Sequence, residues 1–137
     1  MNEKVKCLTV RQPYASLIIH GNKPVENRTW RTGWRGPLLI HAAKKWDKPG
    51  GLDIVERRLI TYQHLWLCSE YGARGAIIGQ VNLVDCVRDS DSEWAEDGMW
   101  HWVFADPIAF EEPIPYRGRQ GLWSIDAAEL EAAKRRI

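Results

Sequence analysis

Three charged side chains within six residues give this sequence its clearest chemical signal. Lys23, Glu26 and Arg28 stand in the segment GNKPVENRTW, which begins at Gly21. If the chain is extended from Val25 onward, Glu26 and Arg28 point to the same face, because strand side chains alternate with period two. Lys23 precedes them across a proline and can reach back over the same face.

A carboxylate between two cations is held in its ionised form and orients both of its partners. The alternative interpretation is a solvated surface ion pair, which contributes little to stability. Composition alone favours that alternative. The flanking residues favour a binding site instead, because a helix is expected to end at Gly21 and two aromatic residues, Trp30 and Trp34, follow the charges.

The neighbouring elements are expected to hold this segment near the surface. Pro13 is well placed to begin a short apolar helix, since its fixed φ suits the first helical turn. Gly21 can take the left-handed conformation that ends a helix. We therefore predict one pocket that contains Lys23, Glu26 and Arg28, with Gln12 or Tyr14 at one side and Trp30 or Trp34 at another.

Eight tryptophans are many for a chain of 137 residues. Trp66 and Trp123 are expected in the core, whereas Trp30, Trp34, Trp46 and Trp94 have charged or turn-forming neighbours and are expected to be less buried. An exposed ring beside Arg or Lys suits base stacking, which contributes ~1–3 kcal/mol per base. The candidates for reading a base edge are Gln12 and Glu26, and the candidates for holding phosphate are Arg28, Arg31, Arg35 and Lys44.

The same region resembles the ASCH domain family. The family signature G-x-K-x-x-E-x-R falls on Gly21, Lys23, Glu26 and Arg28, within RQPYASLIIHGNKPVENRTW, and RGPLLIHAAK follows it. The resemblance continues through GAIIGQVNLVDC at 75–86 and PIPYRGRQGLWSI at 113–125, so it covers most of the chain. It implies a PUA-like fold, which is a small β-barrel with flanking helices, and binding to RNA, nucleotides or modified nucleosides.

The resemblance also implies possible enzymes. Small bacterial proteins of this type include N4-acetylcytidine amidohydrolases that use a lysine, a threonine and a glutamate. Their lysine matches Lys23, but Glu26 replaces their threonine, and a carboxylate is no substitute for a hydroxyl that attacks an amide. If the chain is an enzyme, Glu26 would act as general base on water and Lys23 would stabilise an oxyanion. Ribonuclease activity is also attributed within the family, and His41 or Lys23 would then be the acid–base candidate.

The rest of the pattern predicts an α+β fold in one domain, residues 1–137. Ile77 to Val87 is predicted to be a central strand, because the run is long and rich in β-branched residues. A strand that begins at Trp100 is expected to end at Asp106-Pro107. Strands interrupted by few helices argue against a doubly wound sheet. Apolar residues at three- and four-residue steps predict a helix over Leu52 to Tyr71, packed by Val55, Leu59, Tyr62 and Trp66.

Net charge and cysteine spacing limit the partners. The formal net charge is +1, so we expect weak binding to duplex DNA and a partner that is single-stranded RNA, a nucleotide or a modified nucleoside. No cofactor or metal is expected, because glycine-rich phosphate loops and zinc-ligand spacings are absent.

Cys7, Cys68 and Cys86 lie far apart and are expected to be free thiols in a reducing cytoplasm. The N-terminus is too polar for a secretory signal and no apolar run is long enough to span a membrane.

Two classes of function stay open at this stage, and a binding module ranks above a hydrolase. They differ in what Glu26 must do, since Glu26→Gln would alter only affinity in a binder but would abolish turnover in a hydrolase. The sequence leaves open whether the partner is RNA, DNA or a free nucleoside, and it leaves the oligomeric state open.

Overall fold

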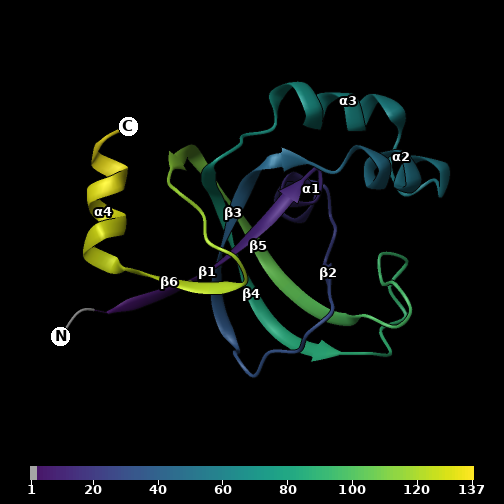
Figure 1. The fold of residues 1–137 in the computed structure, drawn as a ribbon, viewed down its shortest axis with the longest axis horizontal. Helices are drawn as coiled ribbons and strands as arrows, with labels where there is room; N and C mark the ends of the chain where they lie inside the picture. The colour runs from purple at the N-terminus through teal and green to yellow at the C-terminus, as the bar shows by residue number, and fades with distance from the viewer. Residues whose placement is uncertain (1–2) are drawn as a thin grey trace.

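One sheet and four helices make up the described part of the chain. The computed structural model describes residues 3–137, except for the side chains of residues 70 and 71. The six strands have the order β2-β5-β4-β3-β1-β6, in which the β1–β3 ladder is parallel and the others are antiparallel. The fold is therefore α+β, as predicted (Figure 1). The elements in chain order are β1 (Lys4–Gln12), α1 (Tyr14–His20), β2 (Val25–Arg28), β3 (Gly36–Trp46), α2 (Lys48–Glu56), α3 (Tyr62–Tyr71), β4 (Ala76–Val87), β5 (Trp100–Pro115), β6 (Leu122–Asp126) and α4 (Ala127–Arg135).

The two longest strands lie side by side in the sheet. β4 pairs with β3 on one side and β5 on the other, which confirms the central strand predicted over Ile77 to Val87. The predicted end of β5 at Asp106-Pro107 is wrong, because the strand continues to Pro115. The register steps from Ala105 to Ile108, so the two intervening residues bulge out while pairing resumes beyond them. Asp106 has a φ of 53°, which accommodates this bulge.

The sheet curls strongly, but its described strands do not close into a barrel. β2 and β6 are its two edges and share no ladder. β6 pairs with β1 only from Lys4 to Leu8. Beyond Leu8 that edge of β1 pairs with none of the described strands on this side.

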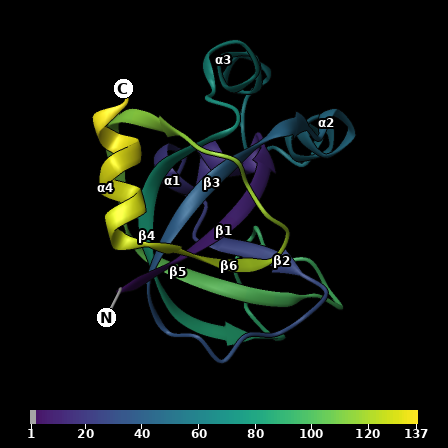
Figure 2. The same cartoon turned by 60° about the vertical axis from the view of Figure 1, so that its left-hand side comes forward.

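Both faces of the central strands are buried. Leu38 and Ile40 of β3 pack with α1 residues such as Ile18 in one core cluster, whereas Leu39 belongs to a second cluster that α4 covers. Alternate residues of one continuous apolar run therefore serve two cores, which is why β3 lacks polar alternation. Figure 2 shows α4 on the opposite side of the molecule from α2 and α3.

The single helix predicted over Leu52 to Tyr71 is wrong in its extent. The chain forms α2 and α3 instead, separated by a turn in which Arg58 has a φ of 61°. A residue in the left-handed region ends a helix, whatever the periodicity of its side chains. Asp47 caps α2 by accepting from the backbone N–H of Gly50, and Thr61 caps α3 by accepting from that of His64.

The predicted core stripe on this helix is also wrong in part. Tyr62 is 66% exposed and Trp66 is 49% exposed, because α3 starts on a new axis after the turn. The residues that pack in the third core cluster are instead Ile54 of α2, Ile60 of the turn and Cys68 of α3.

The three cysteines are free thiols, as predicted, and Cys7 and Cys68 are buried. Within residues 3–137, none of the helices combines the length and apolar composition that a membrane span requires.

Candidate functional site

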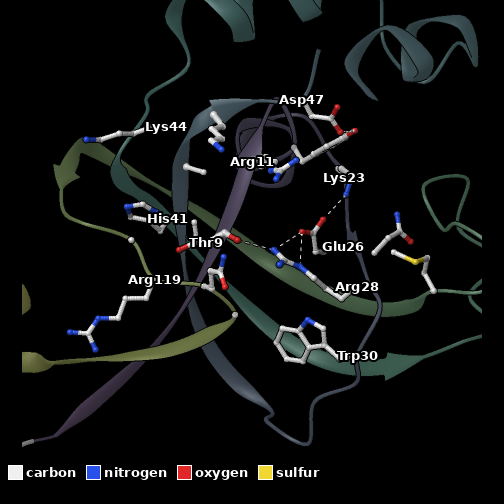
Figure 3. Close-up of a pocket in the computed structure, with 18 of the residues that line it drawn as sticks. Thr9, Arg11, Lys23, Glu26, Arg28, Trp30, His41, Lys44, Asp47 and Arg119 are labelled. Atoms are coloured by element: carbon white, nitrogen blue, oxygen red, sulfur yellow. Dashed lines mark hydrogen bonds and ion pairs between the residues drawn. The ribbon is translucent and has the colours of Figure 1, made fainter. Parts of the chain in front are cut away.

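A cleft of about 1450 Å³ opens where the edge of β1 is left unpaired. Its walls come from β1, β2 and β3, from α2 and the residues that cap it, and from the loops at 88–99 and 116–121. Figure 3 shows Lys23, Glu26 and Arg28 together on one side, which we call the paired end. Opposite them lie His41, Lys44 and the 116–121 loop, which we call the loop end.

At the paired end, one carboxylate is fixed by two cations. Glu26 lies in β2, and its Oε2 accepts from Arg28 at 3.1 Å (Nε) and 2.9 Å (Nη2), while its Oε1 lies 3.4 Å from Lys23 Nζ. The predicted strand and the shared face of Glu26 and Arg28 are therefore confirmed. The side chain of Glu26 is 9% exposed, so this is a largely buried ion-pair network and not a solvated surface pair.

Lys23 is the most buried member of this network. Its side chain is 3% exposed, and Nζ also donates to the carbonyl of Val25. The ammonium group lies 5.4 Å from the centre of the Tyr14 ring and 5.9 Å from that of Trp94, within the range of a cation–π contact. Burial lowers the pKa of Lys23, and the nearby carboxylate of Glu26 opposes that shift.

Arg28 spans the open edge of the sheet. Its Nη2 donates to the backbone carbonyl of Thr9 at 2.8 Å, a group on β1 just beyond the last residue paired with β6. The side chain thus joins β2 to β1, which are not neighbours in the sheet. Truncating Arg28 would remove both this bridge and one partner of Glu26.

At the loop end, a buried histidine holds the 116–121 loop. His41 is 2% exposed, and its Nε2 lies 2.7 Å from the carbonyl oxygen of Tyr116. Because a carbonyl only accepts, Nε2 carries the proton and Nδ1 is left as an acceptor, for which the described residues offer no partner. Burial lowers the pKa of His41. This is the hydrogen-bonded role expected for a lone histidine in a buried strand.

The loop passes directly over this imidazole. A Cβ on Gly118 would lie 2.5 Å from Cε1 and 2.7 Å from Nδ1 of His41, and 3.0 Å from Oγ1 of Thr9. Only glycine fits this close approach without a shift of the loop. At its far end, a Cβ on Gly121 would lie 3.8 Å from the Trp30 ring, so the loop runs from His41 to Trp30 along the cleft.

The cleft concentrates positive charge that the whole chain does not have. Three carboxylates and eight cations are among the described lining residues, in a chain whose formal net charge is only +1. Low net charge therefore coexists with a strongly basic cavity. The three carboxylates are Glu26, Asp47 and Glu96, and the eight cations are Arg11, Lys23, Arg28, Lys44, Lys45, Arg57, Arg117 and Arg119.

The structure gathers most of the predicted site residues around this cleft. Tyr14, Lys23, Glu26, Arg28, Trp30 and Lys44 all line it. Tyr14 donates its hydroxyl to Asp47 at 2.9 Å, and burial together with this bond raises its pKa. Trp30 is 37% exposed, so part of its ring is available to a ligand.

Gln12, Trp34 and Arg35 lie outside the cleft lining. Gln12 is fully buried, and its amide joins Ala73 to the start of α1, donating to the carbonyl of Ala73 at 2.8 Å. Trp34 packs against the first core cluster beyond the turn that follows β2. Arg35 pairs with Asp85 at 3.7 Å. Of the predicted alternatives, the cleft lining therefore contains Tyr14 and Trp30 and not Gln12 or Trp34, and the side chain of Arg35 is exposed outside it.

Sequence reasoning also missed part of the site. Trp94 was expected to be less buried but is 6% exposed, because its ring packs beside Val25 in the third core cluster. Thr9, Arg11 and the 116–121 loop were not assigned to the site. The available signal was the pair of arginines around Gly118, but its position opposite β2 depends on long-range strand pairing. Among the residues described, no cluster of His, Cys, Asp and Glu could hold a metal ion.

Comparison with known proteins places this fold and cleft in a family. The ASCH domain model matches residues 8–114, a range that includes the paired end. The chain is 29% identical over 138 residues to human activating signal cointegrator 1, and 28% identical to the mouse protein of the same name. Each match covers 94% of this chain but only 24% of the relative, so the chain spans about a quarter of the length of these relatives. The chain belongs to the ASCH domain family.

Proposed function

We propose that the cleft binds a nucleobase, presented by single-stranded RNA, a nucleotide or a modified nucleoside, and that the protein acts in RNA metabolism. The observation that carries this proposal is the fixed carboxylate of Glu26 at the floor of a basic cleft with an exposed aromatic ring. The resemblance of the family to RNA- and nucleoside-binding proteins supports the same class of ligand.

The chemistry of the paired end favours a ligand edge that donates hydrogen bonds. A carboxylate that is held by two cations can only accept, so Glu26 selects amino and imino N–H groups such as those on base edges. The ring of Trp30 is a rigid platform for stacking. It packs edge-on against Trp102, with the two ring centroids 4.7 Å apart. Lys23 and Arg28 keep the carboxylate oriented before the ligand arrives, which reduces the ordering cost of binding.

We propose that residues 1–137 form one functional ASCH domain. The curled sheet, open between β2 and β6, corresponds in this proposal to a PUA-like barrel whose gap is the ligand site. A cytoplasmic location fits the free thiols of Cys7, Cys68 and Cys86, which persist in a reducing compartment.

The test is equilibrium binding to a panel of common, acetylated and methylated nucleosides by isothermal titration calorimetry. Glu26→Gln should weaken binding of the preferred nucleoside at least about tenfold, equivalent to ~1.4 kcal/mol, because it removes a charged acceptor. Glu96→Gln is the matched control, since Glu96 lines the same cleft but is exposed. Equal affinities of the wild type and Glu26→Gln, with folding verified, would contradict the proposal.

A hydrolase acting on acylated nucleosides is the second candidate, and the carboxylate of Glu26 lying 3.4 Å from the ammonium of Lys23 favours it. In that reaction Glu26 would take a proton from water as the water oxygen attacks the amide carbonyl, and the Lys23 ammonium would stabilise the oxyanion. Glu26 would then return the proton to the amine nitrogen as the C–N bond breaks, which releases the amine and the carboxylic acid. Chromatography of N4-acetylcytidine incubated with the protein tests this directly. Release of cytidine and acetate that stops in Glu26→Gln would establish the enzyme, whereas unchanged substrate at saturating protein would leave the binding function.

A further inference from the structure

Five cations that line the cleft lack an ion-pair partner among the described residues. Within residues 3–137, neither an ion pair nor a side-chain hydrogen bond involves any of these five groups. The other three lining cations are paired, two with Glu26 and one with Asp53. The unpaired cations are Arg11, Lys44, Lys45, Arg117 and Arg119.

The fold holds several of these charges in place although their tips are free. The stem of Lys44 packs on Gly75, where a Cβ would lie 3.1 Å from Cε of the lysine. Arg117 and Arg119 flank Gly118, which rests on His41 and Thr9. Tyr116 fixes the base of the loop through its backbone N–H to Gly75 at 3.1 Å, and through its hydroxyl to Glu129 at 2.7 Å. The backbone that carries the two arginines is therefore positioned before any ligand binds.

We propose that the loop end is a phosphate subsite, in which Arg117, Arg119 and Lys44 bind the phosphate of a nucleotide whose base lies at Glu26. This inference rests on the proposed function and names its substrate class as phosphorylated nucleotides. Unpaired guanidinium groups on a fixed loop match the geometry of phosphate oxygens. The two ends thus divide the ligand between them, with the base at the paired end and the phosphate at the loop end.

The same loop also borders a second hollow of about 690 Å³, which Arg136 helps to line. A polynucleotide that leaves the cleft over the loop would meet this additional cation. The phosphate can therefore belong to a mononucleotide or to a single strand, and the choice of ligands in the experiment distinguishes the two.

The experiment compares binding of ribonucleosides, their 5′- and 3′-monophosphates, and a labelled eight-nucleotide single-stranded RNA. In the wild type, a monophosphate should bind at least about tenfold more tightly than its nucleoside. Arg117→Gln with Arg119→Gln should abolish that advantage and leave nucleoside affinity within about twofold. Arg88→Gln with Arg135→Gln removes the same charge from two exposed arginines that line neither the cleft nor the second hollow, and should preserve the advantage.

A second pair of variants tests the position of the loop separately from its charge. Gly118→Ala should reduce the monophosphate advantage because the added methyl group pushes the loop off His41. Gly33→Ala, where nothing lies within 4 Å of a Cβ, should not. If RNA is the ligand, the slope of log affinity against log salt concentration should fall in magnitude by about 1.4 in the double arginine variant, at ~0.7 per phosphate contact. Arg136→Gln should then weaken binding of the RNA but not binding of the monophosphate.

The outcomes separate this subsite from the proposed function. A nucleoside and its monophosphates that bind equally well to the wild type would overturn the phosphate subsite and leave base binding at Glu26 intact. A phosphate advantage that survives in the double arginine variant would also overturn it. If the wild type binds no ribonucleoside, monophosphate or RNA, both the subsite and the proposed function are wrong.

Discussion

At the paired end of the cleft, Lys23, Glu26 and Arg28 satisfy one another, whereas at the loop end Arg117 and Arg119 have no described partner. The first group is largely buried and the second is exposed. A buried charge network must be complete in the free protein, because an unpaired charge away from water is costly. An exposed cation stays hydrated until a ligand arrives, so it can be left unpaired.

This difference indicates how the two ends contribute to binding. The paired end contributes a fixed acceptor whose orientation is set in advance, and it therefore governs which base edge is accepted. The loop end contributes positive charge. Its attraction for a ligand is greater when the ligand is anionic and decreases as the salt concentration rises. Substitutions at the two ends should accordingly affect different properties, namely stability and selectivity at one end and salt-dependent affinity at the other.

The largest effect is expected for Glu26→Gln on folding. Loss of the carboxylate leaves the buried ammonium of Lys23 without its counter-charge, which should lower the free energy of unfolding by about 3 kcal/mol. Urea denaturation followed by tryptophan fluorescence measures this change. The double variant Lys23→Met with Glu26→Gln should recover most of the loss, because both charges are then absent.

The matched change at the loop end should leave the stability of the fold almost unchanged, in contrast to Glu26→Gln at the paired end. Arg117→Gln with Arg119→Gln should alter the free energy of unfolding by less than about 0.5 kcal/mol, since exposed charges that belong to no buried network contribute little to stability. A loss of stability as large as that of Glu26→Gln would show that the loop arginines are structural and would remove the distinction.

A smaller effect is expected on ligand affinity when the aromatic platform is removed. Trp30→Ala should weaken nucleoside binding about tenfold, or ~1.4 kcal/mol, because one stacking surface is lost. Trp34→Ala is the control, since Trp34 lies outside the cleft lining. Calorimetric titration of both variants measures the difference, and equal losses in the two would argue against stacking on Trp30.

Two buried histidines, His41 and His101, contrast with each other. His101 pins the 88–99 loop by donating from Nε2 to the carbonyl of Glu96 at 2.7 Å, and its Nδ1 accepts from the backbone N–H of Ser90 at 3.2 Å. His41 pins the other loop in the same way, but its Nδ1 has no described partner. Protonation of His41 would therefore add a buried donor with nothing to accept it.

The smallest predicted effect follows from this unpaired nitrogen. The pKa of His41 is lowered from its ordinary value of 6.5, so below that pH the unfolded chain binds a proton that the folded protein does not. Stability should be full above about pH 6.5 and should fall as the pH drops toward the folded pKa, by at most about 1.4 kcal/mol per pH unit. His41→Gln keeps a donor for Tyr116 and should flatten this part of the profile.

Urea denaturation between pH 7.5 and pH 5.5 measures the pH effect. His20→Gln, at an exposed histidine on α1, is the control and should retain the slope of the wild type. An identical slope in His41→Gln and the wild type would show that His41 does not couple stability to pH.

Local patterns predicted the paired end well, because its geometry depends on neighbouring residues. Period-two alternation was enough to place Glu26 and Arg28 on one face. The loop end depends on the pairing of β1 with β3 and β6, which brings Thr9 beside residues more than a hundred positions away. The split between α2 and α3 depends on one backbone conformation at Arg58, which the apolar periodicity does not report. Gln12 was placed in the pocket for a related reason. Its side chain is fully buried by long-range packing, which the local sequence pattern does not report.

The most direct test of base binding in the cleft is an NMR titration of the nitrogen-15-labelled protein with ribonucleosides and their monophosphates. Eight tryptophans give eight indole N–H resonances, each assignable by single substitution to phenylalanine. We expect the resonance of Trp30 to shift saturably while that of Trp34 does not move, because only the first ring lines the cleft. A titration that shifts Trp34 and leaves Trp30 unchanged, or that moves neither, would contradict the claim that this cleft binds a nucleobase.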